Sequence, residues 1–174
     1  MLGHTIVRPH LLQWLLLLLA FAAAGSAGAQ NAPLPQPSVG DRIPAFDTTL
    51  LNGSTLSGKA LAGRPLLVVL WATWCPTCRK ELPELQKLYE KHRAGGFELL
   101  AVSIDAERLE VDEFWQDHHY TFPVAMRTPR HSEIFGPTRA PPRFFLIDRK
   151  GTLVFRHAGA IGYEQLEAAL KPLL

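Results

Sequence analysis

The sequence predicts one α/β domain with a mixed sheet that is covered on both faces. Two observations favour this fold class: apolar segments of strand length alternate with segments of helical period, and a hairpin pattern followed by a last helix closes the chain. The run PLLVVLWA, residues 65–72, is unbroken and rich in Val and Leu, which is typical of a central strand buried on both faces. The segment FELLAVSI, residues 97–104, predicts a second core strand.

Each expected element has its own signal. Asn52-Gly53 is a dipeptide typical of two-residue hairpin turns. Gly95-Gly96 ends the first long helix, and Pro83 inside that helix predicts a kink. In chain order, we expect a hairpin over 47–51 and 54–56, a strand over 65–72, a helix over 75–94, a strand over 97–104, a helix over 109–119, a short strand over 122–126, a helical turn over 131–135, a hairpin over 143–148 and 152–158, and a helix over 163–174.

Residues 1–29 have the pattern of a secretory signal peptide. A basic start precedes an apolar run over 11–24, and the small residues before Gln30 offer a cleavage site. Cleavage there predicts a protein exported across the inner membrane to the periplasm, and a retained N-terminal membrane anchor is the alternative. Residues 30–40 are rich in proline and predict an extended tether, so the folded domain is expected to span residues 41–174.

The charge balance argues against nucleic acid as a partner. The chain has 18 basic and 16 acidic residues, for a net charge of +2, whereas nucleic-acid binding rests on many phosphate contacts. The charges are uneven, because acidic residues crowd 107–117 and arginines crowd 127–143. A solvated face is the simpler interpretation of the acidic stretch. For Arg139 and Arg143 two interpretations remain, namely attraction of acidic partners and simple solvation. We expect the protein to be a monomer.

The two cysteines, Cys75 and Cys78, directly follow the first buried strand. A disulfide that closes so short a loop hardly constrains the unfolded chain, which disfavours a structural staple. Zinc usually needs four ligands, and the sequence has no second cysteine pair, so no metal is expected. At the start of a helix, backbone N–H groups and the helix dipole lower the pKa of Cys75 below about 8.5. The pair therefore predicts a redox couple in which Cys75 exchanges with a partner and Cys78 resolves the mixed disulfide.

The stretch WATWCPTCRKELPEL, residues 71–85, resembles exported thioredoxin-fold proteins of the TlpA/ResA/CcmG (DsbE) type. A second block, PRFFLIDRKGTLVFRHAG at 142–159, is similar to the cis-proline segment of that family and to the hairpin that follows it. The resemblance implies a thioredoxin fold with an N-terminal hairpin extension. It also implies that the Cys75–Cys78 disulfide is the redox group, with no separate cofactor. By position, the residues expected to contact substrate are Trp74, Pro76, Thr77, Pro141 and Pro142.

Two further roles follow from the resemblance. Pro142 matches the cis-proline of the family, with Pro141 as the alternative, and Pro141 stands where the family usually offers a backbone N–H. Glu81 matches an acidic residue that reductive members use near the active site. Thioredoxin proper has a buried acid six residues before its first cysteine, where this chain has Val69. Glu81 is therefore the candidate proton acceptor for Cys78, and an ordinary surface carboxylate is the alternative.

Together these patterns predict a periplasmic thiol:disulfide oxidoreductase that works as a reductant. The resemblance implies that a membrane thiol reductase supplies the electrons and that an oxidised protein such as apocytochrome c receives them. Both CPTC and RHAG are similar to the cytochrome c maturation branch of the family. Two alternatives remain: a reductant for a copper-site assembly protein, and a non-enzymatic Cu(I)-binding metallochaperone that uses the cysteines as soft ligands.

Overall fold

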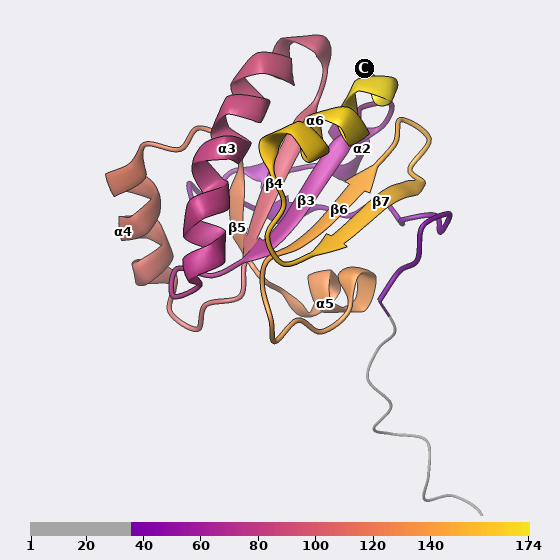
Figure 1. The fold of residues 1–174 in the computed structure, drawn as a ribbon. Coiled ribbons are helices and arrows are strands. Elements are labelled where there is room, and N and C mark those ends of the chain that lie inside the picture. The colour runs from indigo at the N-terminus through magenta and orange to yellow at the C-terminus, as the bar shows by residue number, and fades with distance from the viewer. Residues whose placement is uncertain (1–35) are drawn as a thin grey trace, which may run out of the picture. The chain divides into compact units, whose positions relative to one another are not determined.

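The computed structural model describes residues 36–174, which fold around a five-stranded sheet (Figure 1). The predicted signal peptide and the first part of the predicted tether lie outside the described residues. The strands are β1 (Thr48–Thr49), β2 (Thr55–Leu56), β3 (Leu66–Trp71), β4 (Glu98–Ser103), β5 (Val124–Met126), β6 (Arg143–Ile147) and β7 (Leu153–Ala158). The helices are α2 (Gly58–Leu61), α3 (Pro76–His92), α4 (Arg108–His118), α5 (Pro129–Phe135) and α6 (Tyr163–Leu170), with 3-10 turns η1 (Arg93–Gly95) and η2 (Lys171–Leu173).

The sheet has the strand order β5-β4-β3-β6-β7. Strand β3 pairs in parallel with β4 and antiparallel with β6, while β5 and β7 form the two edges. Helices α3, α4 and α6 contribute to the core on one face, and α2 and α5 contribute to the core on the other (Figure 1). The predicted α/β class and thioredoxin fold are therefore confirmed, including the N-terminal hairpin of β1 and β2.

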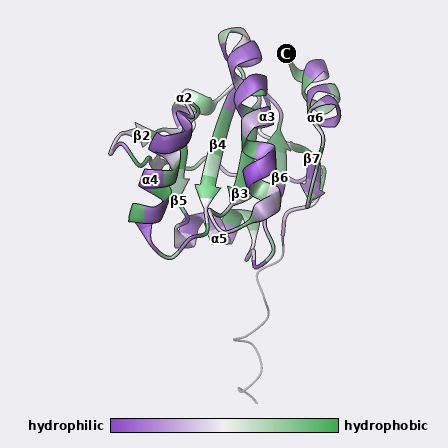
Figure 2. Cartoon of the chain, turned by 60° about the vertical axis from the view of Figure 1, so that its left-hand side comes forward, coloured by the Kyte–Doolittle hydropathy of each residue, from purple (hydrophilic) through white to green (hydrophobic). Residues whose placement is uncertain are grey.

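Strand β3 is buried on both sides because its side chains alternate between the two cores. The odd-numbered residues from Leu67 to Trp71 belong to the core under α3 and α6. The even-numbered residues from Leu66 to Leu70 belong to the core under α5. Figure 2 shows the central strands β3 and β4 in the hydrophobic colour, beside helices in which hydrophobic and hydrophilic residues alternate. The strand predicted over 65–72 is thus confirmed, and its carboxyl end supports the cysteines.

The N-terminal hairpin is present, but the predicted two-residue turn is wrong. The N–H of Leu50 donates to the carbonyl of Ser54 at 2.8 Å, which leaves a three-residue loop from Leu51 to Gly53. Within that loop only Gly53 has a positive φ, of 82°, whereas the expected turn needs a positive φ at both central residues. Tertiary contacts explain the longer loop, because Leu51 is buried in the core and its N–H donates to the carbonyl of Val124 in β5.

The tether was predicted to reach residue 40, but contacts with the domain begin earlier. The guanidinium of Arg156 donates to the carbonyl of Pro37 at 2.8 Å, and the N–H of Gly40 donates to the carbonyl of Leu153 at 2.8 Å. Residues 36–40 are therefore part of the packed domain. Pro37 and Gly40 make these two contacts through main-chain groups, so the composition of the segment did not reveal them.

The remaining differences concern the ends of helices. Helix α3 continues through Pro83, in agreement with the helix expected over 75–94, and ends at His92. Helix α5 begins at Pro129, because Thr128 caps it, and α6 gives way at Lys171 to the 3-10 turn η2. The short helix α2 was not predicted, although Ser57 is a recognisable cap whose hydroxyl accepts the N–H two residues later. Between residues 36 and 174, none of the helices is sufficiently long and apolar to span a membrane.

Candidate active site

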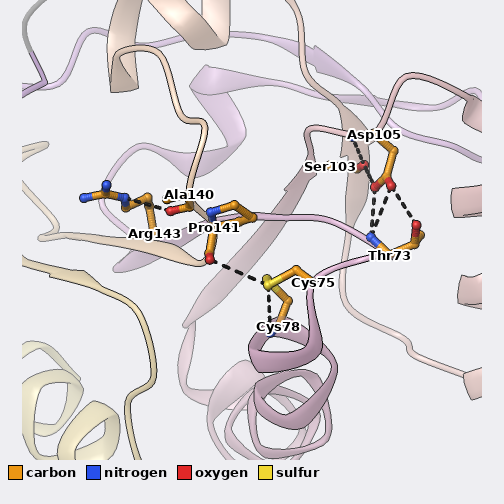
Figure 3. Close-up of a disulfide and its surroundings, with 8 residues drawn as sticks. All are labelled: Thr73, Cys75, Cys78, Ser103, Asp105, Ala140, Pro141 and Arg143. Atoms are coloured by element: carbon orange, nitrogen blue, oxygen red, sulfur yellow. Dashed lines mark hydrogen bonds between the residues drawn. A yellow bond between two sulfur atoms is a disulfide. The ribbon is translucent and has the colours of Figure 1, made fainter.

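Cys75 and Cys78 form a disulfide at the carboxyl end of β3, where α3 begins (Figure 3). Cys75 is the N-cap of α3, and its Sγ accepts the N–H of Cys78 at 3.2 Å. Pro76 occupies the first turn, where a missing N–H removes no helical hydrogen bond. The sulfur of Cys75 therefore lies at the positive end of a 17-residue helix, a position that favours a thiolate in the reduced protein.

The two cysteines differ in solvent exposure. Cys75 is 5% exposed and Cys78 is 1% exposed. Around them, Pro76 is exposed, Thr77 is half-buried, and the indole of Trp74 is 59% exposed. Cys75 is thus the residue that a partner meets first, with Trp74 beside it and Cys78 underneath.

The Pro141-Pro142 loop lies opposite the disulfide (Figure 3). The peptide bond between the two prolines is cis, in agreement with the alignment that places the cis residue at Pro142. The Sγ of Cys75 is 3.6 Å from the carbonyl oxygen of Pro141. The N–H of Gly159, after β7, donates to the carbonyl of Pro142 at 3.0 Å. The loop is therefore tied to the edge of the sheet and its Pro141 carbonyl contacts the more accessible sulfur.

Glu81 is a buried carboxyl group, and the surface alternative is wrong. The residue is 9% exposed, and its Oε1 accepts the N–H of Ile161 at 2.9 Å, from the segment between β7 and α6. Burial raises the pKa of Glu81 above its ordinary value of 4.5. The hydrogen bond from Ile161 opposes that rise, the charge of Glu84 adds to it, and the charge of His157 opposes it. A carboxyl group with a raised pKa, one helical turn beyond Cys78, has the chemistry needed to exchange a proton with that cysteine.

A second buried carboxylate, Asp105, was missed by the sequence reasoning. It accepts the N–H of Thr73 at 3.0 Å, the hydroxyl of Thr73 at 2.6 Å and the hydroxyl of Ser103 at 2.5 Å (Figure 3). Thr73 belongs to the short loop that carries Cys75, so Asp105 fixes that loop to the end of β4. The available signal was the pair of polar residues at the carboxyl end of a core strand, the edge at which α/β sheets place their sites.

Three other residues of the neighbouring strands pack against the rest of the domain. Val69 is fully buried in β3. Trp71 is also fully buried, and its ring packs against Phe114 and Trp115 with centroids 5.4 Å and 5.3 Å away. Trp71 is therefore a core residue rather than a residue of the reactive surface. His157 is half-buried on β7, with its Nε2 2.7 Å from the carbonyl oxygen of Ala160.

Comparisons with known proteins agree with this geometry. The family model described as Redoxin matches residues 38–170. The chain is 32% identical over 163 residues to the thiol-disulfide oxidoreductase ResA of Bacillus anthracis, a match that covers 91% of this chain and 93% of the relative.

Two solved structures show the same similarity. One is from Chlorobium tepidum and is described as a putative thiol:disulfide interchange protein DsbE. It has a TM-score of 0.68 and 28% identity, and the match covers 78% of this chain and 97% of that one. The other is StoA from Bacillus subtilis, with a TM-score of 0.64, 25% identity, and coverage of 72% of this chain and 96% of that one.

Proposed function

The chain belongs to the Redoxin family as a thiol:disulfide oxidoreductase of the TlpA/ResA/CcmG type, and we propose that it reduces disulfides of partner proteins outside the cytoplasm. One observation carries the proposal. A dithiol pair at the start of α3 faces the cis-proline loop, and the buried carboxyl of Glu81 lies one turn further along the same helix. This arrangement supplies a nucleophile, a resolving thiol and a proton acceptor.

The reaction begins from the reduced protein. The thiolate of Cys75 attacks one sulfur of the partner disulfide, forms a mixed disulfide and releases the other partner sulfur as a thiolate. Backbone N–H groups at the start of α3 stabilise the attacking thiolate. The exposed indole of Trp74 and the half-buried Pro141 and Thr77 provide the surface that a partner chain contacts, together with Pro76.

The second step resolves the mixed disulfide. Cys78 loses its proton and attacks the Sγ of Cys75, which releases the second partner sulfur as a thiolate and leaves the Cys75–Cys78 disulfide present in the structure. Two electrons pass to the partner in one cycle. Glu81 takes the proton of Cys78, because its pKa is raised above the ordinary value and it follows Cys78 by three positions, on the same face of α3.

Burial of Glu81 also supports the reducing direction. A dithiol becomes a stronger oxidant when its reduced, thiolate form is stabilised. A buried carboxyl close to Cys78 opposes a second negative charge there, which favours the disulfide form and lowers the reduction potential. The measurement is the equilibrium with glutathione or dithiothreitol. A potential near that of thioredoxin, about −270 mV, supports a reductant, and one near about −120 mV contradicts it.

The proposed location is the periplasm, with electrons supplied by a membrane thiol reductase. The signal-peptide pattern of residues 1–29 supports export. The proposed acceptor is apocytochrome c or a component that delivers it, and a copper-site assembly protein is the second candidate.

A trapping experiment identifies the acceptor. In Cys78→Ala, the mixed disulfide at Cys75 has no resolving thiol, so we expect covalent partner adducts that disappear on addition of dithiothreitol. The double variant Cys75→Ala/Cys78→Ala is the matched control. If cells expressing Cys78→Ala yield no more adducts than this control, exchange with partner proteins through Cys75 is refuted.

A further inference from the structure

Three basic side chains surround the loop that faces the disulfide. We call them the arginine rim: Arg127, Arg139 and Arg143. The Nε of Arg143 donates to the carbonyl of Ala140 at 3.1 Å (Figure 3), and Arg127 donates through a terminal nitrogen to the carbonyl of Thr138 at 3.4 Å. Arg139 is exposed and precedes Pro141 by two positions. The Pro141 carbonyl of this loop is 3.6 Å from the Sγ of Cys75, so the rim arginines belong to the loop that contacts the accessible sulfur or bond to it. The guanidinium of Arg143 lies on the side of the loop away from the disulfide (Figure 3).

The positive charge of the rim is uncompensated. Between residues 36 and 174, none of the three arginines lies within 4.0 Å of an acidic side chain. Arg130, on the neighbouring helix α5, differs because it pairs with Glu133 at 3.0 Å. Each rim arginine that binds a loop carbonyl uses part of its guanidinium and retains further N–H donors. These donors are available to carboxylates of a second molecule.

Acidic residues gather instead on helix α4. Helix α4 contributes to the core on the α3 face of the sheet, whereas α5 contributes to the core on the other face (Figure 1). The acidic residues of α4 and its cap are Glu107, Glu110, Asp112, Glu113 and Asp117. Of these, Asp112 forms an ion pair, with Arg108. A molecule that docks on Cys75 therefore meets the rim on the cis-proline side and the exposed Arg79 and Lys80 at the start of α3, with the acidic residues of α4 beyond them.

We propose that the arginine rim selects partner proteins that carry an acidic segment next to the target disulfide. The inference rests on the proposed function and specifies its substrate class. Pro141 has no N–H with which to pair a partner strand, and the guanidinium groups at the same loop offer charged donors in its place. The 59% exposed indole of Trp74 provides an apolar centre beside this charged border, an arrangement found in protein interfaces.

The test compares disulfide substrates that differ in charge alone. Two peptides share one internal disulfide and carry three aspartates or three lysines on one flank. The reduced protein is mixed with each, and the second-order rate constant is followed by tryptophan fluorescence. We expect the acidic peptide to react about tenfold faster, with a ratio that falls toward one as salt rises from about 50 mM to about 500 mM.

Two rim variants and one control variant localise the effect. Arg139→Glu/Arg143→Glu is expected to abolish or invert the preference, and Arg139→Glu alone to reduce it, which keeps the test valid if the double variant folds poorly. Lys59→Glu/Lys150→Glu changes the net charge equally, at exposed positions beside the amino end of β3 and the turn after β6. This control is expected to retain the preference.

The outcomes separate this inference from the proposed function. Bis(2-hydroxyethyl) disulfide is uncharged and reports on exchange itself. If the protein reduces it but treats both peptides alike, or if the control pair removes the preference as strongly as the rim pair does, selection by the rim is refuted while exchange stands. If the protein reduces none of the three substrates, the proposed function itself fails.

Discussion

Asp105 holds the loop that carries the nucleophile, so removing its carboxylate should cost both stability and rate. In Asp105→Ala, three donor groups lose their acceptor: the N–H of Thr73 and the hydroxyls of Thr73 and Ser103. Ser103 and Asp105 are buried, so water replaces the carboxylate poorly. At about 1–2 kcal/mol for each unpaired donor, the loss is about 3–6 kcal/mol of unfolding free energy.

The assay is urea unfolding of the oxidised protein, followed by tryptophan fluorescence. With a slope of about 1–3 kcal/mol per molar urea, the midpoint should fall by at least about 1 M. Asp47→Ala is the matched control, because exposed Asp47 accepts a single N–H, from Gly58 at 2.8 Å, and its loss costs about 1 kcal/mol. Asp105→Asn, which keeps an acceptor oxygen, should fall between the two.

The second measurement, a reduction rate, reports on the position of the loop that carries Cys75. Displacement of the attacking sulfur by about 1 Å can reduce a rate by about a hundredfold. Asp105→Ala should therefore slow reduction of bis(2-hydroxyethyl) disulfide, measured well below the unfolding midpoint, whereas Asp47→Ala should not. The reasoning is refuted if Asp105→Ala loses no more stability than Asp47→Ala and reduces the neutral disulfide at the parental rate.

Two predictions concern pH. The pKa of Glu81 is raised in the folded protein. Its favourable contribution to the free energy of unfolding is therefore complete below the ordinary pKa of 4.5 and is lost as pH rises through the raised pKa of the folded state. Glu81→Gln should thus be more stable than the parent at neutral pH, and its resolution of a Cys75 mixed disulfide should be slower and less dependent on pH; parental rates at all pH values would contradict a proton-transfer role. The pKa of Glu167 is lowered to about 2 by hydrogen bonds to Lys91, His92, Tyr163 and Lys171. Its contribution to the free energy of unfolding is therefore complete above pH 4.5 and is lost as pH falls toward 2. Glu167→Gln should therefore destabilise the α3–α6 contact at pH 7 in urea unfolding and match the parent near pH 2; an equal deficit at both pH values would show that packing, not charge, is responsible.

The sequence predicted those features that depend on neighbouring residues. The apolar run of β3 identifies a doubly buried strand by itself, and the spacing of Cys75 and Cys78 at a helix start identifies a redox pair. The two-residue turn at Asn52-Gly53 failed because a tertiary contact overrode the local preference: burial of Leu51 and its bond to Val124 require a longer loop.

The features of the site that the sequence left undecided depend on contacts across long sequence separations. Asp105 bonds to Thr73 over 32 positions, and Glu81 bonds to Ile161 over 80 positions. Glu81 stands three positions after Cys78 and four before Leu85, on the buried face of α3, but the hydrogen bond to its carboxyl comes from a segment that follows β7. Prediction of such a group requires the packing of distant elements, which periodicity alone does not provide.

The two buried carboxyl groups beside the disulfide are suited to different tasks. Both oxygens of Asp105 accept hydrogen bonds, from the loop before Cys75 and from the end of β4, which fixes a position. Glu81 accepts one hydrogen bond, at Oε1, from within the described residues, and desolvation raises its pKa. A carboxyl with a free oxygen and a raised pKa can exchange a proton without dismantling a network. Because buried Val69 provides no titratable group beneath the two cysteines, the proposed acceptor for the proton of Cys78 is Glu81 on α3, while Asp105 is proposed to position the loop that carries Cys75.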